Sequence, residues 1–452
     1  MYIVGNGKLI TFDPAGVDSD CGAVAVDGAR IAAVGELDRI RAAYTDAEFI
    51  DAEGGIIMPA LADLHSHSRY SLLRSLAIPL YPKDESCRFF DPFLSRIDSM
   101  LCAEDLLAAA YANAIRCIRH GITSVFELQA PPLCGEGCLR LTASAYRECG
   151  IRSCLGCEVS DRLGARQAAA AIRENAEFAE FCQELDIELV RSAFGLGSAT
   201  DLSDAALKAA VEANGGRTFF HFHAGITADE APVSIRQHGL RPVERLARAG
   251  VLDSPCLAAG GFHLSSSELE LIAAGGGSLV LTPHLSAALG TVPEQRLPWQ
   301  QCSIRLLIGS DPFCARLKDA SIHAYALLAR AEAEKEPYTA DTSRTAETAA
   351  ANMLLFSNPA AASEVFGVRL GVLASGAAAD IIVLRPSPFM PVGEGALGAW
   401  RLVCSPDTRC ELTMAAGRLL MRNGEILSAD EALHAAEFGR RAAALARRMS
   451  EK

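Results

Sequence analysis

The sequence contains no run of about 18 or more apolar residues, the length that a membrane-spanning helix requires. Its first residues, MYIVGNGKLITFDP, lack the basic segment followed by a long apolar segment that marks a secretory signal. The formal net charge is −13, so the chain also lacks the excess of lysine and arginine on which nonspecific nucleic-acid binding depends. These absences predict a cytoplasmic protein that binds neither membranes nor nucleic acids and acts on a small-molecule substrate.

Cysteine, by contrast, is not scarce. The 15 cysteines are odd in number and scattered, and most stand in apolar runs such as IRSCLGCEV. This distribution predicts buried free thiols in a reducing compartment rather than disulfides. With 452 residues, of which 50% are apolar and 21% charged, the chain is long enough for one large domain and a smaller one.

The two ends of the chain have a similar pattern of apolar and polar residues. Short alternating runs separated by glycine turns fill residues 1–57 and return in residues 366–430, as in RCELTMAAGRLLMRNGEIL. Such runs predict hairpins. Because chain ends commonly lie close together, both regions are expected to build one composite β-sandwich around the inserted residues 58–365. Residues 431–452 predict a basic amphipathic helix that is packed or solvated rather than bound to a membrane.

The inserted region repeats one unit, an apolar strand-like run followed by a helical stretch. Eight such runs within about 300 residues predict an α/β fold of the (β/α)8 barrel type, also called a TIM barrel. An open doubly wound sheet is the alternative, but no GxGxxG motif follows the first strand to favour it. The runs are GGIIMPALADLH, ITSVFEL, IRSCLGCEV, ELVRSAFGL, TFFHFHA, PCLAAGGFH, SLVLTPH and IRLLIGSDP.

Polar residues of the metal-binding kinds stand at the ends of the first, fifth, sixth and eighth runs. In such a barrel these strand ends gather at one rim, where active sites lie, and residues i and i+2 of a strand share a face. Each residue alone could be a polar strand end, a core histidine or a helix cap, but their coincidence predicts one divalent metal, Zn²⁺ first and Fe²⁺ or Mn²⁺ as alternatives. The residues are His65, His67, His221, His223, His263 and Asp311.

A metal at this rim would activate a water molecule for hydrolysis. Asp311 would take the proton of this water as general base while it contacts the metal. Arg69 follows the first pair of histidines and is a candidate for substrate binding, as are Glu127 at the end of the second run and His284 after the seventh.

The chain resembles the amidohydrolase superfamily nearly end to end. The resemblance lies in GGIIMPALADLHSHSRYSLLRSLA, HGITSVFE, HFHAG, LIGSDP and LGVLASGAAADIIVL. It is similar to the cytosolic branch that holds guanine deaminase, S-adenosylhomocysteine deaminase and the triazine hydrolases, and most of all to SsnA-like aminohydrolases. A homodimer is typical of this family.

The resemblance implies a role for each residue of the rim. His65, His67, His223 and Asp311 would bind one metal ion. His263 would be a catalytic residue at the tetrahedral centre or the activated water. His221 would support the ligands from one layer away.

One departure from the family concerns the proton relay. Deaminases of this branch carry a glutamate three residues after the fifth-strand histidine, whereas this chain has Ile226. Another carboxylate could replace it (Glu127, Glu158, Asp229 or Glu230), the substrate could need no ring protonation, or catalysis could be lost. We therefore expect a metal-dependent aminohydrolase that acts on C–N bonds of a small nitrogenous, heterocyclic substrate. The alternative is a catalytically impaired or non-enzymatic metal-binding relative.

Overall fold

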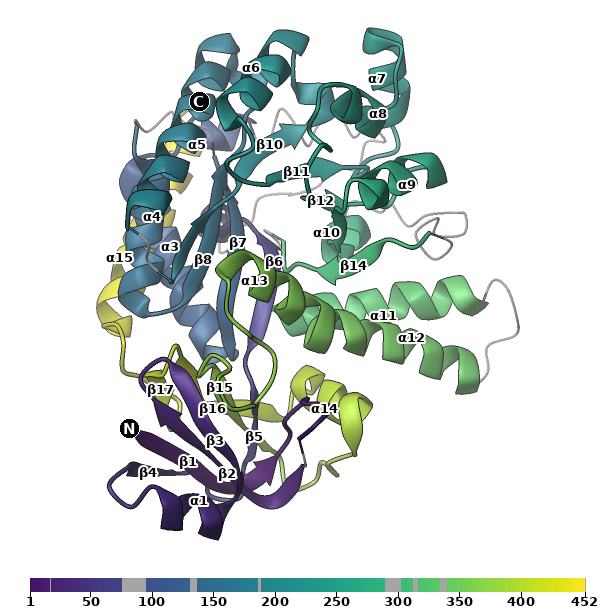
Figure 1. Ribbon diagram of the computed structural model, residues 1–452. Coiled ribbons are helices and arrows are strands. Elements are labelled where there is room, and N and C mark those ends of the chain that lie inside the picture. The colour runs from purple at the N-terminus through teal and green to yellow at the C-terminus, as the bar shows by residue number, and fades with distance from the viewer. Residues whose placement is uncertain are drawn as a thin grey trace.

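The structure is a computed structural model that describes residues 1–16, 18–74, 95–130, 136–185, 188–288, 302–311, 316–333 and 340–451. Parallel strands follow one another around a barrel, which fills the upper part of the molecule in Figure 1. All eight predicted strand regions form strands, which confirms the (β/α)8 barrel. They are β6 (Leu61–Ser66), β7 (Ile122–Gln129), β8 (Arg152–Cys157), β9 (Val190–Ser192) with β10 (Phe194–Ser198), β11 (Phe220–Ala224), β12 (Cys256–Gly260), β13 (Ser278–Leu281) and β14 (Arg305–Ile308).

The fourth barrel strand is divided at Ala193. β9 pairs with β8, whereas β10 pairs with β11. The Ala193 N–H donates to the carbonyl of Leu155, and the next N–H, that of Phe194, donates to the carbonyl of Phe219, both at 2.9 Å. The backbone thus changes partner within two residues, and this change joins the two hydrogen-bonded sheets into one wall.

Helices follow the strands and cover the outside of the barrel (Figure 1). The helices are α3 (Ala103–Arg119), α4 (Cys138–Cys149), α5 (Ala165–Leu185), α6 (Asp204–Asn214), α7 (Glu230–His238), α8 (Pro242–Arg248), α9 (Ser266–Ala274), α10 (Pro283–Ala288), α11 (Leu317–Ala333), α12 (Ala340–Asn352) and α13 (Asn358–Phe366). Serine side chains cap the starts of α6 and α9; Ser265 Oγ accepts the Glu268 N–H while the Glu268 carboxylate accepts the Ser265 N–H, a capping box.

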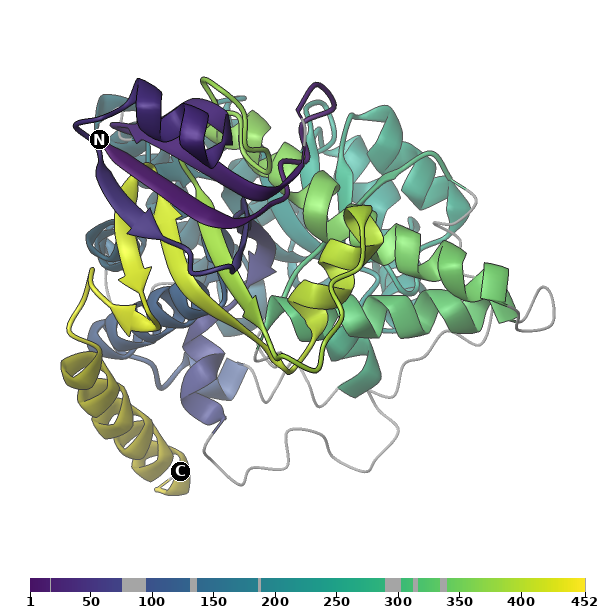
Figure 2. The same ribbon diagram turned by 90° about the horizontal axis from the view of Figure 1, so that it is seen from below.

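The two ends of the chain meet in one nine-stranded sheet below the barrel (Figures 1 and 2). β15 lies antiparallel to β5, with Ile382 opposite Met58, so the C-terminal strands extend the N-terminal ones. Apolar side chains of both halves, such as Val24 and Val383, share one buried core. The composite domain is thus confirmed, while its exact boundaries stay a prediction. The strands are β1 (Tyr2–Leu9), β2 (Ser19–Asp27), β3 (Arg30–Glu36), β4 (Glu48–Asp51), β5 (Ile56–Pro59), β15 (Ile381–Pro386), β16 (Thr408–Ala415), β17 (Arg418–Arg422) and β18 (Glu425–Ile426), with α1 (Leu37–Ala43) beside them and α14 (Gly395–Cys404) between β15 and β16.

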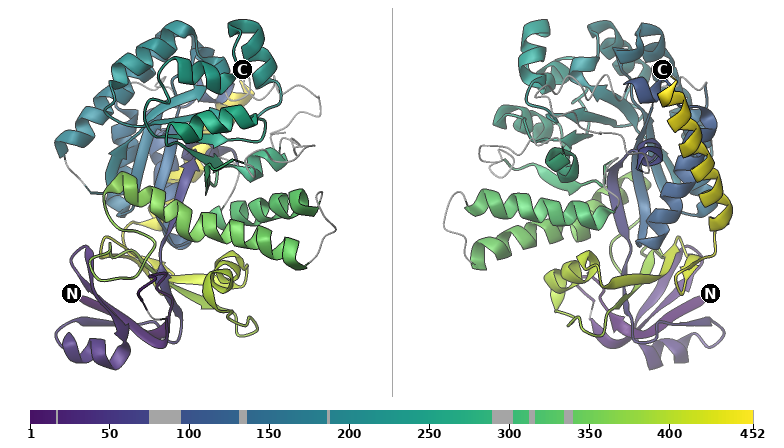
Figure 3. Two further views of the ribbon diagram at one scale, coloured as in Figure 1. Left: turned by 45° about the vertical axis from the view of Figure 1, so that its right-hand side comes forward. Right: turned by 180° about the vertical axis from the view of Figure 1, so that it is seen from behind.

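The predicted C-terminal helix is α15 (Glu431–Ser450), which packs along α3 (Figure 3). Its Leu445 is fully buried, and the Arg448 guanidinium donates to Asp105 of α3 at 2.6 Å. The part of the chain that the structure describes contains no helix long and apolar enough to cross a membrane. The twelve cysteines within it are free thiols.

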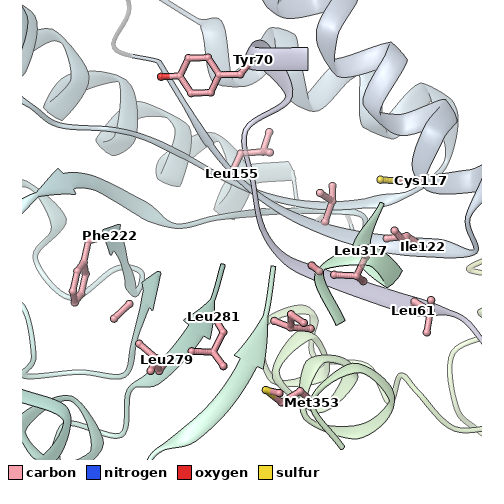
Figure 4. Packing of buried hydrophobic residues seen from close by; sticks show 14 of the residues in the cluster. Leu61, Tyr70, Cys117, Ile122, Leu155, Phe222, Leu279, Leu281, Leu317 and Met353 are labelled. Atoms are coloured by element: carbon pink, nitrogen blue, oxygen red, sulfur yellow. The ribbon is translucent and has the colours of Figure 1, made fainter. Parts of the chain in front are cut away.

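Apolar side chains fill the barrel on both sides of its wall. Inside, Leu64, Phe126 and Leu307 pack with Phe366, which comes from α13. A larger cluster lies between the strands and the helices and includes Cys117 of α3 and Leu317 of α11 (Figure 4). The rim thereby rests on a close-packed interior that holds the strand ends in place.

The barrel closes between β14 and β6 through the buried side chain of Asn358. Its Nδ2 donates to the carbonyls of Ala62 in β6 and Ile308 in β14, both at 2.8 Å, and its Oδ1 accepts the Ile308 N–H at 2.9 Å. Gly309 follows, and a Cβ on it would lie 2.6 Å from the Cβ of His65. Only glycine therefore lets the end of β14 lie this close to the first histidine of the rim.

We predict that Asn358→Ala lowers the free energy of unfolding by about 2–4 kcal/mol, because it leaves buried backbone groups of two strands without partners. Chemical denaturation measures this change. Lys208→Ala is the control, since it removes an exposed ion pair with Glu212 in α6 and should cost less than about 0.5 kcal/mol. Equal stability of the two variants would contradict this account of the closure.

Candidate metal and catalytic site

Three of the predicted ligands converge at the rim of the barrel. His65 lies near the end of β6, His67 directly follows this strand, and His223 lies in β11. Their ligand atoms lie within 4.8 Å of one another, and Nε2 of His65 is 3.1 Å from Nε2 of His67. The pairing of β6 with β7 shifts register between Asp63 and Ser66. Such irregularities are common next to active sites, where they change the direction in which side chains point.

The environment keeps the imidazoles of His65 and His67 neutral. Burial holds the pKa of His65 well below its usual range, and the neighbouring His67 lowers it further. Burial followed by the charge of Arg69 does the same to the pKa of His67. A neutral imidazole has a lone pair that can bind a metal.

His221 contacts His65 inside the barrel, and its supporting role stays a prediction. It is fully buried, and its Nε2 lies 2.9 Å from Nδ1 of His65. Burial, followed by the charge of His223, lowers its pKa to about 3. Because Nδ1 of His65 faces His221, the other nitrogen of His65, Nε2, lies on the side of His67.

Asp311 joins the group through its backbone. Its N–H donates to the His65 carbonyl at 3.1 Å, and its φ of 56° is left-handed. Its carboxylate oxygens are buried, have no hydrogen-bond partner of standard geometry among the described residues, and lie outside the group within 4.8 Å. Burial, and then the Asp63 carboxylate, raise the pKa of Asp311 well above its usual range. A carboxyl group in this environment gains most from a nearby cation.

His263 follows β12 and lies half-buried at the same rim. Its N–H donates to the Gly225 carbonyl at 3.0 Å, which ties it to the loop after β11. Its Nε2 has no partner among the described residues. Burial lowers the pKa of His263, while the charge of Asp229 acts in the opposite direction.

Glu158, one residue past β8, is the carboxylate that contacts the histidine group. Its Oε1 lies 3.2 Å from Nε2 of His223 and 3.5 Å from Nδ1 of His67. Its Oε2 lies 3.1 Å from the guanidinium of Arg69. Burial alone would raise the pKa of Glu158, but the charge of Arg69 and the hydrogen bond with His223 outweigh it and hold this pKa well below its usual range.

Arg69 and Glu127, the expected substrate-binding residues, face protein groups instead. Arg69 is 1% exposed and bonds Asp98, Glu158 and the Leu128 carbonyl. Glu127 is fully buried and accepts hydrogen bonds from Ser68, Gln129 and Tyr146. Because both side chains are saturated by protein partners, they hold the strand ends together and leave no atom for a substrate. His284 is half-buried, with its Nδ1 3.2 Å from Nδ1 of His323.

The loop after β11 is built around Glu230. Its carboxylate accepts the backbone N–H groups of Gly225, Ile226 and Thr227 at 2.8–3.2 Å. Asp229 accepts the Thr227 hydroxyl at 2.7 Å and lies half-buried. Glu230 is therefore committed to the loop, and position 226, where the family resemblance implies a glutamate, has the apolar side chain of isoleucine.

The sequence did not single out Asp98 and Arg162, which complete the charged surroundings of Glu158. Asp98 pairs with Arg69 at 3.1 Å, and Arg162 lies 3.4 Å from Glu158 and 3.7 Å from Asp201. A charged residue within an apolar run, as in SRIDSML, is the signal that could have revealed Asp98.

The donor set fits one divalent cation. It offers three converging imidazoles and a buried carboxylate without a hydrogen-bond partner of standard geometry among the described residues. A separation of 3.1 Å between two ligand nitrogens is compatible with one ion about 2.0–2.1 Å from each.

A model of the amidohydrolase family matches residues 56–395. The chain belongs to the amidohydrolase family. This confirms the predicted assignment to the metal-dependent hydrolases of this superfamily. A second match, to an imidazolonepropionase-like composite domain of bacteria, covers residues 22–47 in the N-terminal part of the nine-stranded sheet.

Curated relatives and solved structures extend the similarity over most of the chain. A 5-methylthioadenosine/S-adenosylhomocysteine deaminase of Halobacterium salinarum is 26% identical over 92% of this chain and 93% of its own length. An adenosine deaminase from Xanthomonas campestris with bound zinc has a TM-score of 0.82 at 20% identity, covering 99% of this chain and 98% of its own. The zinc complex of the atrazine chlorohydrolase TrzN from Arthrobacter aurescens TC1 has a TM-score of 0.78 at 21% identity, covering 98% and 100%. These structures share the fold of this chain, while the specific closeness to SsnA-like aminohydrolases stays a prediction.

We predict that His67→Ala reduces the metal content of zinc-loaded protein severalfold, because it removes one of three converging ligands. Elemental analysis after dialysis measures the content. His238→Ala serves as the matched control, since this histidine lies away from the rim in α7 and its loss should leave the content unchanged. Unchanged metal content in the His67 variant would refute its role.

Proposed function

We propose that this protein hydrolyses C–N bonds of a small nitrogenous, heterocyclic substrate. The observation that carries the proposal is the buried group of His65, His67 and His223 beside Asp311 at the active rim of an amidohydrolase barrel. The printed names of similar proteins, deaminases of adenosine-type compounds and a triazine chlorohydrolase, support this substrate class.

In this proposal His65, His67, His223 and Asp311 hold one divalent metal, with Zn²⁺ preferred and Fe²⁺ or Mn²⁺ also suited to such ligands. The metal, when bound, acts as a Lewis acid that activates a water molecule. His221 keeps His65 oriented through the contact of 2.9 Å. Asp311 accepts the proton of the attacking water as general base.

His263 acts on the substrate side. Its Nε2, which no described residue engages, donates or accepts a hydrogen bond at the tetrahedral centre and so polarises the scissile bond. The backbone bond to Gly225 holds His263 against the loop after β11. Arg69 and Glu127 act by positioning the strand ends, and His284 remains the proposed direct contact to the substrate.

The proton relay of ordinary deaminases is missing. Ile226 neither accepts nor donates a proton. The four carboxylates that could replace the glutamate are each held by protein partners: Glu127, Glu158, Asp229 and Glu230. General acid–base assistance is worth about 10²- to 10⁴-fold in rate. The site therefore fits a substrate that needs no protonation of its ring. The same observation favours the alternative, a catalytically impaired relative that still binds metal.

The sequence leads to two further proposals, on the oligomeric state and on the location of the protein. The family resemblance suggests a homodimer, which light scattering of the purified chain tests. The free thiols suggest a reducing, cytoplasmic location.

We predict that Ile226→Glu raises ammonia release from aminopurines or aminotriazines by at least about 10²-fold, because it restores an acid–base group to the loop. A coupled ammonia assay on zinc-loaded protein measures the gain. The matched control is Ile235→Glu, which adds the same charge at an exposed position of α7 and should change nothing. No gain at position 226 would point to a reaction other than deamination.

A further inference from the structure

A cavity of about 560 Å³ lies at the starts of the barrel strands, whereas the histidines of the rim lie at their ends. It is lined by the first residues of β12, β13 and β14, by β9 and the segment before β11, and by α5 and α13. No residue of the metal site is among its described lining residues. Its volume falls within the range of about 300–1,000 Å³ that is typical of pockets for small molecules.

The apolar part of the lining continues the interior of the barrel. Phe126 and Leu257 belong to the interior cluster, while Phe219 and Val365 pack against this cluster and stay partly exposed. The ring centroids of Phe126 and Phe219 lie 6.5 Å apart. A barrel interior is normally filled by its own side chains, so the apolar surface that stays open here can accept an apolar group from outside.

The polar part of the lining is positively charged. Three arginines, Arg191, Arg217 and Arg305, line the cavity together with one carboxylate among its described lining residues, that of Glu364. Guanidinium groups bind carboxylates and phosphates through paired N–H donors. Charge complementarity therefore favours an anion as the occupant.

Arg191 and Arg217 lie on the same side of the cavity. The residues that follow them, Ser192 and Thr218, are joined by a hydrogen bond of 2.5 Å from Thr218 Oγ1 to the Ser192 carbonyl. The two arginines thus occupy corresponding positions on adjacent segments, and both line the cavity. One acid group can reach both of them.

Two of the arginines are paired with carboxylates that a ligand can replace. Arg217 lies 4.0 Å from Glu180, whose side chain is 58% exposed. Arg305 lies 2.9 Å from Glu364, whose side chain is 67% exposed. Ion pairs with exposed partners are weak because water screens them. An anion inside the cavity is screened less, so it can compete with these carboxylates.

We propose that this cavity binds a small organic anion, with its carboxylate or phosphate group at Arg191 and Arg217 and its apolar body against Phe219 and Leu257. The site is separate from the metal, and the inference does not rest on the proposed function. Neither half of the lining is sufficient alone, since the arginines select the charge and the apolar wall selects the body of the ligand.

The first experiment measures binding to the full, zinc-loaded chain by calorimetry. Naphthoate is the probe, and naphthyl phosphate carries the alternative acid group. Naphthamide has the same body without the charge, and acetate has the charge without the body. We expect one of the two naphthyl anions to bind at least about tenfold more tightly than naphthamide and acetate. The tighter anion identifies the acid group that the cavity prefers.

The second experiment locates the bound anion. Arg217→Gln removes a charge from the cavity wall, and we expect it to raise the Kd of the preferred anion about tenfold, the typical loss of a hydrogen bond to a charged group. Arg173→Gln is the matched control, because this arginine of α5 is 56% exposed and lies outside the cavity. Its Kd should equal that of the wild type.

Two further measurements separate this cavity from the metal site, which could also bind an anion. Val365→Trp places a large ring in the cavity, so we expect it to abolish binding. Removal of zinc by a chelator leaves the cavity intact, so we expect the Kd to stay unchanged.

Four outcomes overturn the inference. They are no binding of either naphthyl anion at about 1 mM, equal affinity for naphthamide, an unchanged Kd in Arg217→Gln, and binding that is lost when zinc is removed. The last outcome would assign the anion to the metal site. None of the four contradicts the proposed hydrolase function, which depends on residues at the other end of the barrel.

Discussion

The hydrogen bonds between the last and the first barrel strand are the contact on which the metal site depends. The Asp311 N–H bonds the His65 carbonyl, the Ser310 N–H bonds the Asp63 carboxylate at 2.9 Å, and Asn358 spans both strands. These bonds bring a carboxylate from one end of the barrel sequence beside histidines from the other. The left-handed turn at Asp311 lies where the backbone is already held on β6, so the surrounding structure compensates for its strain.

Charge is distributed unevenly around this closure. On one side, Asp63 and Asp311 are both buried, and the charge of Asp63 disfavours ionisation of Asp311. On the other side, Arg69 neutralises Asp98 and Glu158 through direct ion pairs. The histidines lie between an acidic pair that a cation would stabilise and a compensated network that needs none. This distribution of charge supports the proposal of a single ion on the Asp311 side of the group.

The parts of the site that follow from local pattern could be predicted from the sequence. His65 and His67, and likewise His221 and His223, share a face because a strand has a period of two residues. The contact of Glu158 with the histidines could not be predicted in this way, because Glu127 and Glu158 both end apolar runs and look alike in sequence. They differ in position, since Glu127 lies within β7, where it pairs with Leu155, whereas Glu158 lies beyond β8. The burial of Arg69 depends on Asp98 and Glu158, which are distant in sequence, and no local pattern contains that information.

The order in which the chain is made gives the nine-stranded sheet a further significance. β5 lies between β1 and β15, so a nascent chain that has completed the N-terminal strands still has one open edge at Ile56–Pro59. The strand that covers this edge follows the whole barrel, which at cellular synthesis rates takes on the order of tens of seconds to appear. Open edges recruit other strands. The N-terminal half of this sheet is thus the segment with most reason to meet a chaperone before the barrel is finished.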